Sequence, residues 1–557
     1  MESDAGARIA PMSRVRPAAC LVAAAVLLPG ASSAGPARPA IWFAPLPPLR
    51  TFEARPYVGS ADFMQLFTKK AAWPNAARRV SVFKLYGEWV AHTASSTQLR
   101  RAVTDLKRRR IAIAVEVGPL DAPPECGQAV EGFAGMQEGL RIAYRIKAAG
   151  GTLRSVAFDE PFYYAALYTG PHACRWDARR VAEDVAAYVR GIRTVFPDAR
   201  FGDTEPLTTG GHVARYEEWI DAYREVTGES LAFIHLDLWY TLPRWPQLAR
   251  ELEEFARSRG VPFGIIYNGD GSDVSDAAWL AKAQQRFELY ETEGGRPDHA
   301  VLQSWADKPD RVLPETRRTF TNLIRRYARP RTRLELDPSG ADVVGRLLAA
   351  DALPGARVRL SVERTYEDSA YASSGTLATA SATTGADGRF QAVLTAPPGA
   401  AMVARYPGST RYWPAYAVVR NGPGLRNVAR GQPAVASGER ATEPPAAAID
   451  GDATTRWGAG QFAPQWIEID LGAPVAIGAV RLGVDQFPDG ETVHAVLGRP
   501  PGGSYRELHV FQGRTTNGEL LEYVPPAPWE EIRYLRIETR ASPSWVAWRE
   551  IEVFASG

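Results

Sequence analysis

Residues 153–161 read Leu-Arg-Ser-Val-Ala-Phe-Asp-Glu-Pro, a short apolar run that ends in two acidic residues and a proline. A run of this length and composition is typical of a buried strand. The stretches 131–149 before it and 177–196 after it have the apolar spacing of amphipathic helices. A strand between two such helices predicts a parallel sheet with helices on its faces.

The same alternation of strands and helices continues from residue 40 to residue 328. Eight such units in roughly 290 residues match a (β/α)8 barrel better than an open doubly wound sheet. No Gly-rich phosphate fingerprint follows the first strand, which also disfavours a dinucleotide-binding sheet. We therefore predict a barrel over residues 38–329. Its predicted strands are Ile41–Pro45, Val80–Trp89, Ile111–Gly118, Leu153–Pro161, Ala199–Pro206, Leu231–Tyr240, Pro262–Asp270 and Ala300–Trp305.

Acidic residues stand at the ends of the third to seventh predicted strands, where the active site of such a barrel lies. A carboxylate that faces an apolar lumen must be hydrated, paired with a cation or engaged in binding or catalysis. With the basic, amide and aromatic side chains nearby, these acids predict a saccharide site. The alternative is a rim of solvated charges around a different ligand. The predicted substrate-binding residues are Lys84, Tyr86, Glu116, Asp203, His235, Trp239, Asn268, Gln303 and Trp305.

Glycoside hydrolysis needs one protonated and one ionised carboxyl group. The barrel resembles glycoside hydrolase barrels in general, in which the proton donor often follows the fourth strand, and this resemblance implies Glu160 as the donor. Asp159 is the reserve for that role, because side chains alternate and a regular strand cannot turn both residues to the lumen. His235 is expected to orient substrate or fill the core rather than to bind a metal, and no catalytic cofactor is predicted.

Three acids compete for the role of partner to the proton donor. Asp237 shares a strand face with Trp239, Glu205 shares one with Asp203, and Asp270 lies in a Gly-flanked, turn-like setting after the seventh strand. The sequence alone leaves the choice among Asp237, Glu205 and Asp270 open.

After residue 329 the helical pattern stops. Residues 331–421 show short alternating strands separated by turns such as Pro354-Gly355 and Gly385-Ala386-Asp387-Gly388. This segment loosely resembles the immunoglobulin-like spacer domains of exported bacterial enzymes. The resemblance implies an immunoglobulin-like β-sandwich with a mechanical role.

Residues 425–557 form a third predicted unit. The segments 447–457 (Ala-Ala-Ile-Asp-Gly-Asp-Ala-Thr-Thr-Arg-Trp), 465–472 (Gln-Trp-Ile-Glu-Ile-Asp-Leu-Gly) and 548–553 (Trp-Arg-Glu-Ile-Glu-Val) stand in a distinctive order. They resemble the coagulation factor 5/8 type C (discoidin) family. That resemblance implies a galactose-binding-like jelly-roll sandwich acting as a carbohydrate-binding module. It also implies a structural calcium held by Asp450, Asp452, Thr455 and Glu550, the alternative being a turn without an ion.

Residues 1–34 have the order of a secretory signal peptide, with Arg14 and Arg16 before an apolar run and small residues after it. We therefore expect a secreted or periplasmic protein with no membrane segment after cleavage, and a monomer. The two remaining cysteines, Cys126 and Cys174, follow the third and fourth strands and form either one disulfide or two free thiols. A net charge of +2 gives no reason to expect nucleic acid as a partner.

Together these features predict an exported glycoside hydrolase that acts on a poly- or oligosaccharide and is anchored to glycan by its C-terminal module. Two alternatives stay open, because fold alone does not decide function. One is a non-catalytic carbohydrate-binding or adhesion protein with a degenerate barrel. The other is a barrel enzyme with different sugar chemistry, such as deacetylation.

Overall fold

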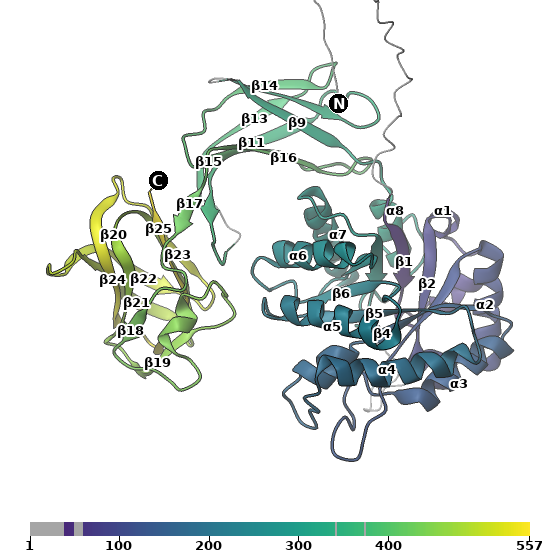
Figure 1. Cartoon of the computed structure of the whole chain (residues 1–557). Coiled ribbons are helices and arrows are strands. Elements are labelled where there is room, and N and C mark those ends of the chain that lie inside the picture. Colours follow the sequence, from purple (N-terminus) through teal and green to yellow (C-terminus); the bar gives the residue numbers. More distant parts are fainter. Residues whose placement is uncertain (1–37, 50–58, 340–341, 372–374, 557) are drawn as a thin grey trace, which may run out of the picture. The chain divides into compact units, whose positions relative to one another are not determined.

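The computed structural model describes residues 38–49, 59–339, 342–371 and 375–556 (Figure 1). The predicted signal peptide lies outside the described residues. Among the described helices, none combines the length and the apolar character needed to cross a bilayer.

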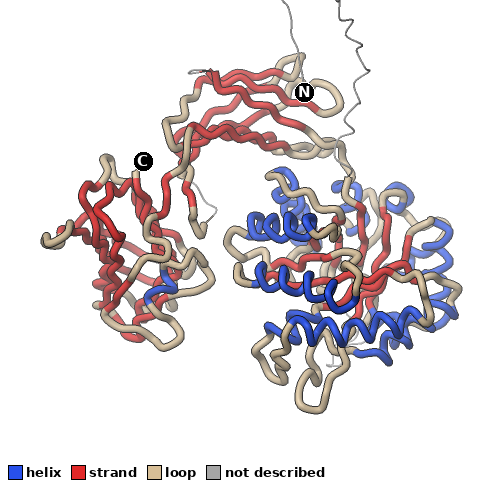
Figure 2. The backbone as a smooth tube through the Cα atoms, in the orientation of Figure 1, coloured by secondary structure: helices blue, strands red, loops and turns tan. Residues whose placement is uncertain are grey.

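The N-terminal part is a closed parallel barrel of eight strands in the order β1 to β8, with β8 paired to β1, so the predicted barrel is confirmed. Helices surround these strands (Figure 2). The strands are β1 (Ala40–Ala44), β2 (Val80–Tyr86), β3 (Ala112–Val117), β4 (Leu153–Asp159), β5 (Arg200–Leu207), β6 (Ile234–Leu238), β7 (Phe263–Tyr267) and β8 (His299–Gln303). The helices are η1 (Phe63–Phe67), α1 (Pro74–Ala77), η2 (Trp89–Thr93), α2 (Ser96–Arg109), α3 (Gly135–Ala148), η3 (Tyr163–Leu167), α4 (Ala178–Arg193), α5 (His212–Thr227), α6 (Trp245–Ser258), α7 (Asp276–Thr292) and α8 (Phe320–Tyr327).

The strands divide their side chains between two cores. In β6, Ile234, Leu236 and Leu238 belong to the large core beneath the helices. The opposite face of the strands fills the bottom of the lumen with a smaller cluster made of Trp42, Ala114, Ala157, Phe233, Ile266 and Val301. Further along most of the strands the lumen-facing residues become polar, as at Glu116, Asp159 and Gln303. The packed lower layer therefore forms the floor of a polar cup at the carboxyl ends of the strands.

Helix termini help to position these units. Ser95 and Gln98 form a capping box at the start of α2, and the side chains of Asp177 and Ser275 accept hydrogen bonds from backbone N–H groups at the starts of α4 and α7. Each such cap satisfies an N–H group that has no partner within the helix.

The middle part consists of two antiparallel sheets. One contains β9 (Arg333–Ser339), β10 (Asp342–Leu348) and β14 (Arg389–Val393), and the other contains β11 (Arg357–Arg364), β13 (Thr376–Thr383), β15 (Ala400–Tyr406) and β16 (Ala415–Asn421). Side chains of both sheets, including Val343, Leu347, Leu360 and Met402, share one core. This part is therefore an all-β unit, as predicted.

The C-terminal part is also rich in sheet. Its strands include β17 (Leu425–Asn427), β18 (Ala434–Ala436), β19 (Trp457–Phe462), β20 (Gln465–Val484), β21 (Gly490–Arg499), β22 (Arg506–Thr515), β23 (Leu520–Tyr523), β24 (Trp529–Ala541) and β25 (Trp545–Ala555). Trp457, Ile467, Ile537 and Trp548 are fully buried at its centre. A short helix, η4 (Pro445–Ala448), packs against this sheet.

Candidate active site

A cavity of about 670 Å³ lies at the carboxyl ends of the barrel strands, where the polar cup was expected. It is lined by residues of β2 to β8 and of the segments that follow several of these strands. The predicted residues that line it are Tyr86, Glu116, Asp159, Glu160, Asp237, Trp239, Asn268, Asp270, Gln303 and Trp305.

Both acids at the end of β4 line this cavity. Asp159 is the last residue of the strand, and Glu160 follows with φ 52°, in the left-handed region. The restriction expected for a regular strand does not apply, because the strand ends before Glu160 and its alternation stops there. A non-glycine residue in such a conformation costs about 1–3 kcal/mol and persists only where its surroundings hold it. The N–H of Glu160 donates to the carbonyl of Thr204 at 3.0 Å.

Three carboxyl groups in the cavity have raised pKa values. Burial, reinforced by the charge of Glu131, raises the pKa of Asp159 to about 7. Burial also raises the pKa of Asp237 to about 7, against the opposing charge of Lys84. Burial and the charges of Asp237 and Asp159 raise the pKa of Glu160 well above its usual range. The raised pKa of Glu160 favours its protonated form, and the two aspartates change charge near pH 7.

The same three carboxyl groups are unsatisfied. Among the described residues, no donor makes a hydrogen bond to the side-chain oxygens of Asp159, Glu160 or Asp237. Their oxygens are not among the buried side-chain atoms that lack a partner, because they are open to the cavity, where water can reach them. In a cavity of this size, a ligand can supply the missing partners.

Lys84 and Gln303 hold Glu116 in place. Lys84 makes a buried ion pair with Glu116, and Gln303 Nε2 donates to Glu116 Oε1 at 2.7 Å. Burial lowers the pKa of Lys84 to about 7, against the charges of Asp159 and Asp237. Lys84 lies behind Glu116 and does not line the cavity itself. Tyr86 is fixed at the same wall, because its hydroxyl donates to the carbonyl of Ser304 at 2.7 Å.

Asp270 also lines the cavity but is fully engaged. Lys282 Nζ lies 2.5 Å from its Oδ2, and Arg286 pairs with its other oxygen. Although burial acts to raise it, these two cations lower the pKa of Asp270. Arg286 also donates to Asn268 Oδ1 at 3.1 Å. Asp270 is thus an ionised wall residue that orients Arg286.

The prediction that Asp203 and Glu205 face the lumen is wrong. Asp203 Oδ2 accepts from Trp219 Nε1 of α5 at 2.6 Å, which places it on the helix side of β5. Glu205 accepts from the backbone N–H groups of residues 162 and 163 at 2.8 and 2.9 Å. The register pairs Thr204 with Asp159 on one side and with His235 on the other, so Thr204 takes the lumen face instead.

His235 does not contact the cavity either. It is fully buried in the layer below, stacked on Phe233 with ring centroids 4.4 Å apart, and its Nε2 lies 3.0 Å from His299 Nδ1. Burial lowers the pKa of His235 well below its usual range, which keeps the ring neutral. The predicted substrate contact is therefore wrong, and the core alternative holds.

Several lining residues were not predicted from the sequence. Glu131 comes from the loop after β3 and accepts from the hydroxyl of Tyr164, which lies after β4, at 2.8 Å. Arg286 reaches the cavity from α7 and lies 4.0 Å from the ring centre of Tyr240. Glu131, Tyr164 and Arg286 lie outside the strands, where no strand alternation could have pointed to them.

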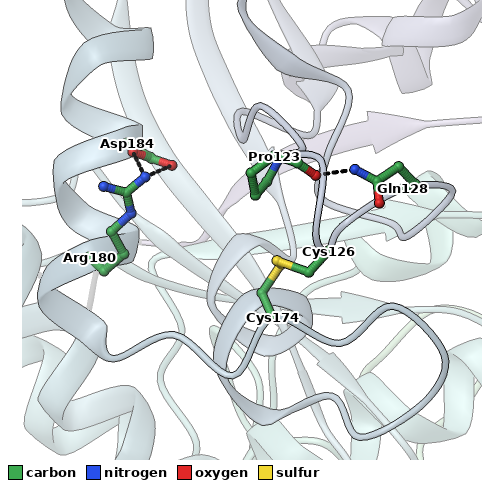
Figure 3. Close-up of a disulfide and its surroundings, with 6 residues drawn as sticks. All are labelled: Pro123, Cys126, Gln128, Cys174, Arg180 and Asp184. Carbon is green, nitrogen blue, oxygen red and sulfur yellow. Dashed lines mark hydrogen bonds and ion pairs between the residues drawn. A yellow bond between two sulfur atoms is a disulfide. The ribbon is translucent and has the colours of Figure 1, made fainter.

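The two loops that carry Glu131 and Tyr164 are tied by a disulfide (Figure 3). Cys126 and Cys174 are bonded, with Cα atoms 5.1 Å apart, so the predicted bridge is confirmed. The N–H of Gly127 also donates to the carbonyl of His172 at 2.8 Å. The bridge therefore fixes two segments of the cavity rim to each other.

Three of the four predicted calcium ligands, Asp450, Thr455 and Glu550, lie at one turn of the C-terminal part. The carboxylates of Asp450, Asp452 and Glu550 do not all lie within 4.8 Å of one another. Thr455 Oγ1 donates to Asp450 Oδ2 at 2.8 Å, and the N–H of Gly451 donates to Glu550 Oε1 at 3.1 Å. Glu550 is fully buried, its Oε2 has no hydrogen-bond partner, and burial raises its pKa to about 9. An unpartnered buried carboxylate oxygen beside Asp450 fits a hard cation such as calcium. The side chain of Asp452 is turned to Thr454 instead.

A second, smaller pocket of about 150 Å³ lies in the C-terminal part and was not predicted. Trp545 and Phe487 stand at it with 48% and 86% of their surface exposed. Arg456 is held there between Glu443 at 2.7 Å and Asp485 at 2.8 Å. Exposed rings beside fixed charged groups offer the stacking faces and hydrogen-bonding groups that a sugar ring needs.

Comparisons with known proteins address this C-terminal part. The chain is similar to the family 32 CBM of Clostridium perfringens NanJ in complex with galactose, at 16% identity over 22% of this chain and 93% of that chain, with a TM-score of 0.20. It is also similar to chitosan-binding module 1 of a Paenibacillus sp. IK-5 chitosanase/glucanase, at 22% identity over 23% of this chain and 98% of that one, with a TM-score of 0.21.

A third similar structure is CpGH89CBM32-5 of Clostridium perfringens in complex with GalNAc-β-1,3-galactose, at 18% identity over 23% of this chain and 99% of that one, with a TM-score of 0.21. Among curated proteins, no sequence matches the chain. The family model of the F5/8 type C domain matches residues 433–551, and these residues form an F5/8 type C domain.

Proposed function

We propose that the protein is an exported glycoside hydrolase whose barrel cleaves a poly- or oligosaccharide. The observation that carries the proposal is the cavity in which Asp159, Glu160 and Asp237 come together without hydrogen-bond partners and with raised pKa values. Perturbed carboxyl groups that converge in a cleft are typical of acid–base catalysis.

Each carboxyl group has a role that its environment favours. Glu160, whose pKa is raised well above its usual range, donates its proton to the oxygen of the leaving sugar. Asp237, which changes charge near pH 7, acts in its ionised form as the nucleophile or base, with Asp159 as the second candidate. Trp239 and Trp305, which are 60% and 43% exposed, provide faces on which sugar rings stack at the rim.

The F5/8 type C domain anchors the enzyme to glycan in this proposal. Trp545, Phe487 and Arg456 bind a sugar in the small pocket, which raises the concentration of polymer near the barrel. The middle part acts as an immunoglobulin-like spacer. A structural calcium held by Asp450 and Glu550 would neutralise the buried carboxylates and support the fold of the domain.

A non-catalytic adhesion protein is the second candidate, because the pocket at Trp545 accounts for binding without any chemistry in the barrel. Both proposals are tested by incubating the full chain with a panel of polysaccharides. The release of reducing ends measures hydrolysis, and the fraction of protein that sediments with insoluble polysaccharide measures binding. A hydrolase releases new reducing ends, and Glu160→Gln releases none. Binding that Trp545→Ala abolishes, without release by the parent chain, identifies an adhesion protein instead.

A further inference from the structure

The wall of the barrel cavity carries far more acid than base. Among the described residues that line it, the only cationic side chain is that of Arg286. The lining acids are Glu88, Glu116, Glu131, Glu138, Asp159, Glu160, Asp237 and Asp270. This excess is local, because the whole chain has a net charge of only +2.

Some of these acids have cationic partners from the protein itself. Glu116 pairs with Lys84, Asp270 pairs with Arg286, and Glu138 Oε2 lies 3.6 Å from Arg141 Nη1. Five others form no ion pair with any described residue, and they are Glu88, Glu131, Asp159, Glu160 and Asp237. The cavity therefore lacks cations at its centre.

This lack has an electrostatic cost. The charge of Glu131 adds to burial in raising the pKa of Asp159, and it acts in the same direction on Asp237 and Glu160. Like charges at short range in a poorly solvated site disfavour ionisation. A cation placed among them would reverse the effect and turn Asp237 into the ionised form that catalysis requires.

We infer that the natural substrate is a cationic glycan, whose sugar rings carry free amino groups that are bound as ammonium ions by Glu131 and its neighbouring carboxylates. The inference rests on the proposed hydrolase and specifies its substrate class. Neutral glycans would leave these carboxylates without charge partners, and anionic glycans would be repelled by them.

The spacing of the acids favours ammonium groups over a single metal ion. Among the described residues, the only group of three acidic, histidine or cysteine ligands with atoms within 4.8 Å of one another is Glu88, His92 and Glu138, of which Glu88 and Glu138 line this cavity. Glu131, Asp159, Glu160 and Asp237 do not gather in this way. A divalent cation needs its ligands around one point, whereas ammonium groups on successive rings suit acids spread along a wall.

The direct test compares substrates that differ only in the amino group. The full chain is incubated with glucosamine and galactosamine oligomers and with their N-acetylated counterparts of equal length, in buffer with and without a chelator. We expect kcat/KM to be about ten- to hundredfold higher for the free amines, the range of a charge-assisted hydrogen bond. The preference should shrink as the salt concentration rises.

A variant locates the preference in the cavity. Glu131→Gln keeps an acceptor for Tyr164 but removes the charge, so the ratio of kcat/KM between amine and N-acetyl substrates should fall about tenfold. Glu131→Asp, which restores the charge, should recover part of it. Exposed Glu183→Gln is the matched control and should leave the ratio unchanged.

The outcomes separate the two proposals. If N-acetylated, neutral or uronic acid oligomers are cleaved faster than the free amines, the inference is overturned and the proposed hydrolase is kept. A preference for the free amines that disappears when the chelator is added has the same meaning. If no oligomer is cleaved, calorimetry follows with the Trp545→Ala chain, in which the small pocket is disabled. Binding of glucosamine oligomers that Glu131→Gln weakens would then keep the inference and reject hydrolysis. Absence of binding would overturn both.

Discussion

The barrel contains two groups of buried acids at strand ends, and they behave differently. Asp159, Glu160 and Asp237 line the cavity, whereas Asp203 and Glu205 face the helices. Burial raises the pKa of Asp203 to about 7, the same value as for Asp237, against hydrogen bonds from Trp219 and others that lower it. A perturbed pKa therefore does not distinguish the two groups.

What distinguishes them is whether the protein satisfies their oxygen atoms. Asp203 accepts from the Trp219 indole and from the backbone of Thr204, and Glu205 accepts from two backbone N–H groups. The described residues supply no such donors to Asp159, Glu160 or Asp237. A satisfied buried acid stabilises the fold, while an unsatisfied acid in a cavity is available to a ligand.

The largest expected effect is the loss of turnover in Glu160→Gln. The amide keeps the shape of the side chain but cannot supply a proton, so kcat should fall about 10²–10⁴-fold. Steady-state rates on the best substrate of the panel measure this, and thermal melting checks the fold. Asp237→Asn should be at least as damaging. Full activity in Glu160→Gln would transfer the role of proton donor to Asp159.

The same contrast predicts a calcium effect in the F5/8 type C domain, where Glu550 has one satisfied and one unsatisfied oxygen. Calcium at 100 times its Kd should stabilise the domain by about 2.7 kcal/mol, and a chelator should reverse this. Because the pKa of Glu550 is raised to about 9, binding at pH 7 should release a proton.

Calorimetry in buffers of different ionisation enthalpy measures that proton, and melting with and without chelator measures the stability. Glu550→Gln should abolish both responses, while Glu538→Gln, whose carboxylate pairs with Arg540 on the surface, should keep them. If the melting temperature of the parent chain is the same with and without chelator, the turn needs no ion.

Much of this contrast was beyond the reach of the sequence. Alternation along β6 correctly placed Asp237 toward the lumen and Leu236 toward the helices, because the apolar row was unbroken. In β5 both faces carry polar or small residues, so the pattern had no apolar row to orient it, and Asp203 and Glu205 were assigned to the wrong face. The barrel itself followed from strand and helix periodicity, which many residues determine together.

Contacts between distant segments explain the remaining errors. Glu160 reaches the cavity only because the chain turns left-handed there, and no residue type other than glycine announces such a turn. Glu131 depends on a loop fixed by the bridge from Cys126 to Cys174, and Arg286 depends on how α7 packs. These are tertiary effects that a single sequence does not encode locally.

Glu205→Gln should lower the stability of the fold rather than the catalytic rate. The amide leaves one of the two backbone N–H groups without an acceptor, which should lower the free energy of unfolding by about 1–3 kcal/mol. Urea denaturation measures this, and kcat should change less than tenfold. A stable Glu205→Gln variant with turnover as low as that of Glu160→Gln would instead make Glu205 a catalytic partner.

The smallest effects concern pH, where the two groups should separate cleanly. Asp237 must be ionised to act, and its pKa of about 7 means that kcat/KM should fall about tenfold per pH unit below that value. For stability the sign is opposite. Both Asp237 and Asp203 have folded-state pKa values above those of the unfolded chain, so the folded state binds more protons between pH 4 and 7.

The contribution of these two groups to the free energy of unfolding should therefore be greatest in acid and decline as the pH rises toward about 7, by up to about 1.4 kcal/mol per pH unit for each group. Asp203→Asn should flatten this decline and leave the acidic limb of kcat/KM in place, since Asp203 does not touch the cavity. Asp237→Asn should flatten the decline and abolish activity. Profiles of kcat/KM and urea denaturation across pH 4–8 measure the activity and the stability of each variant. If the acidic limb of kcat/KM shifts to another pH in Asp203→Asn, the hydrogen-bonded acids are part of the catalytic system after all.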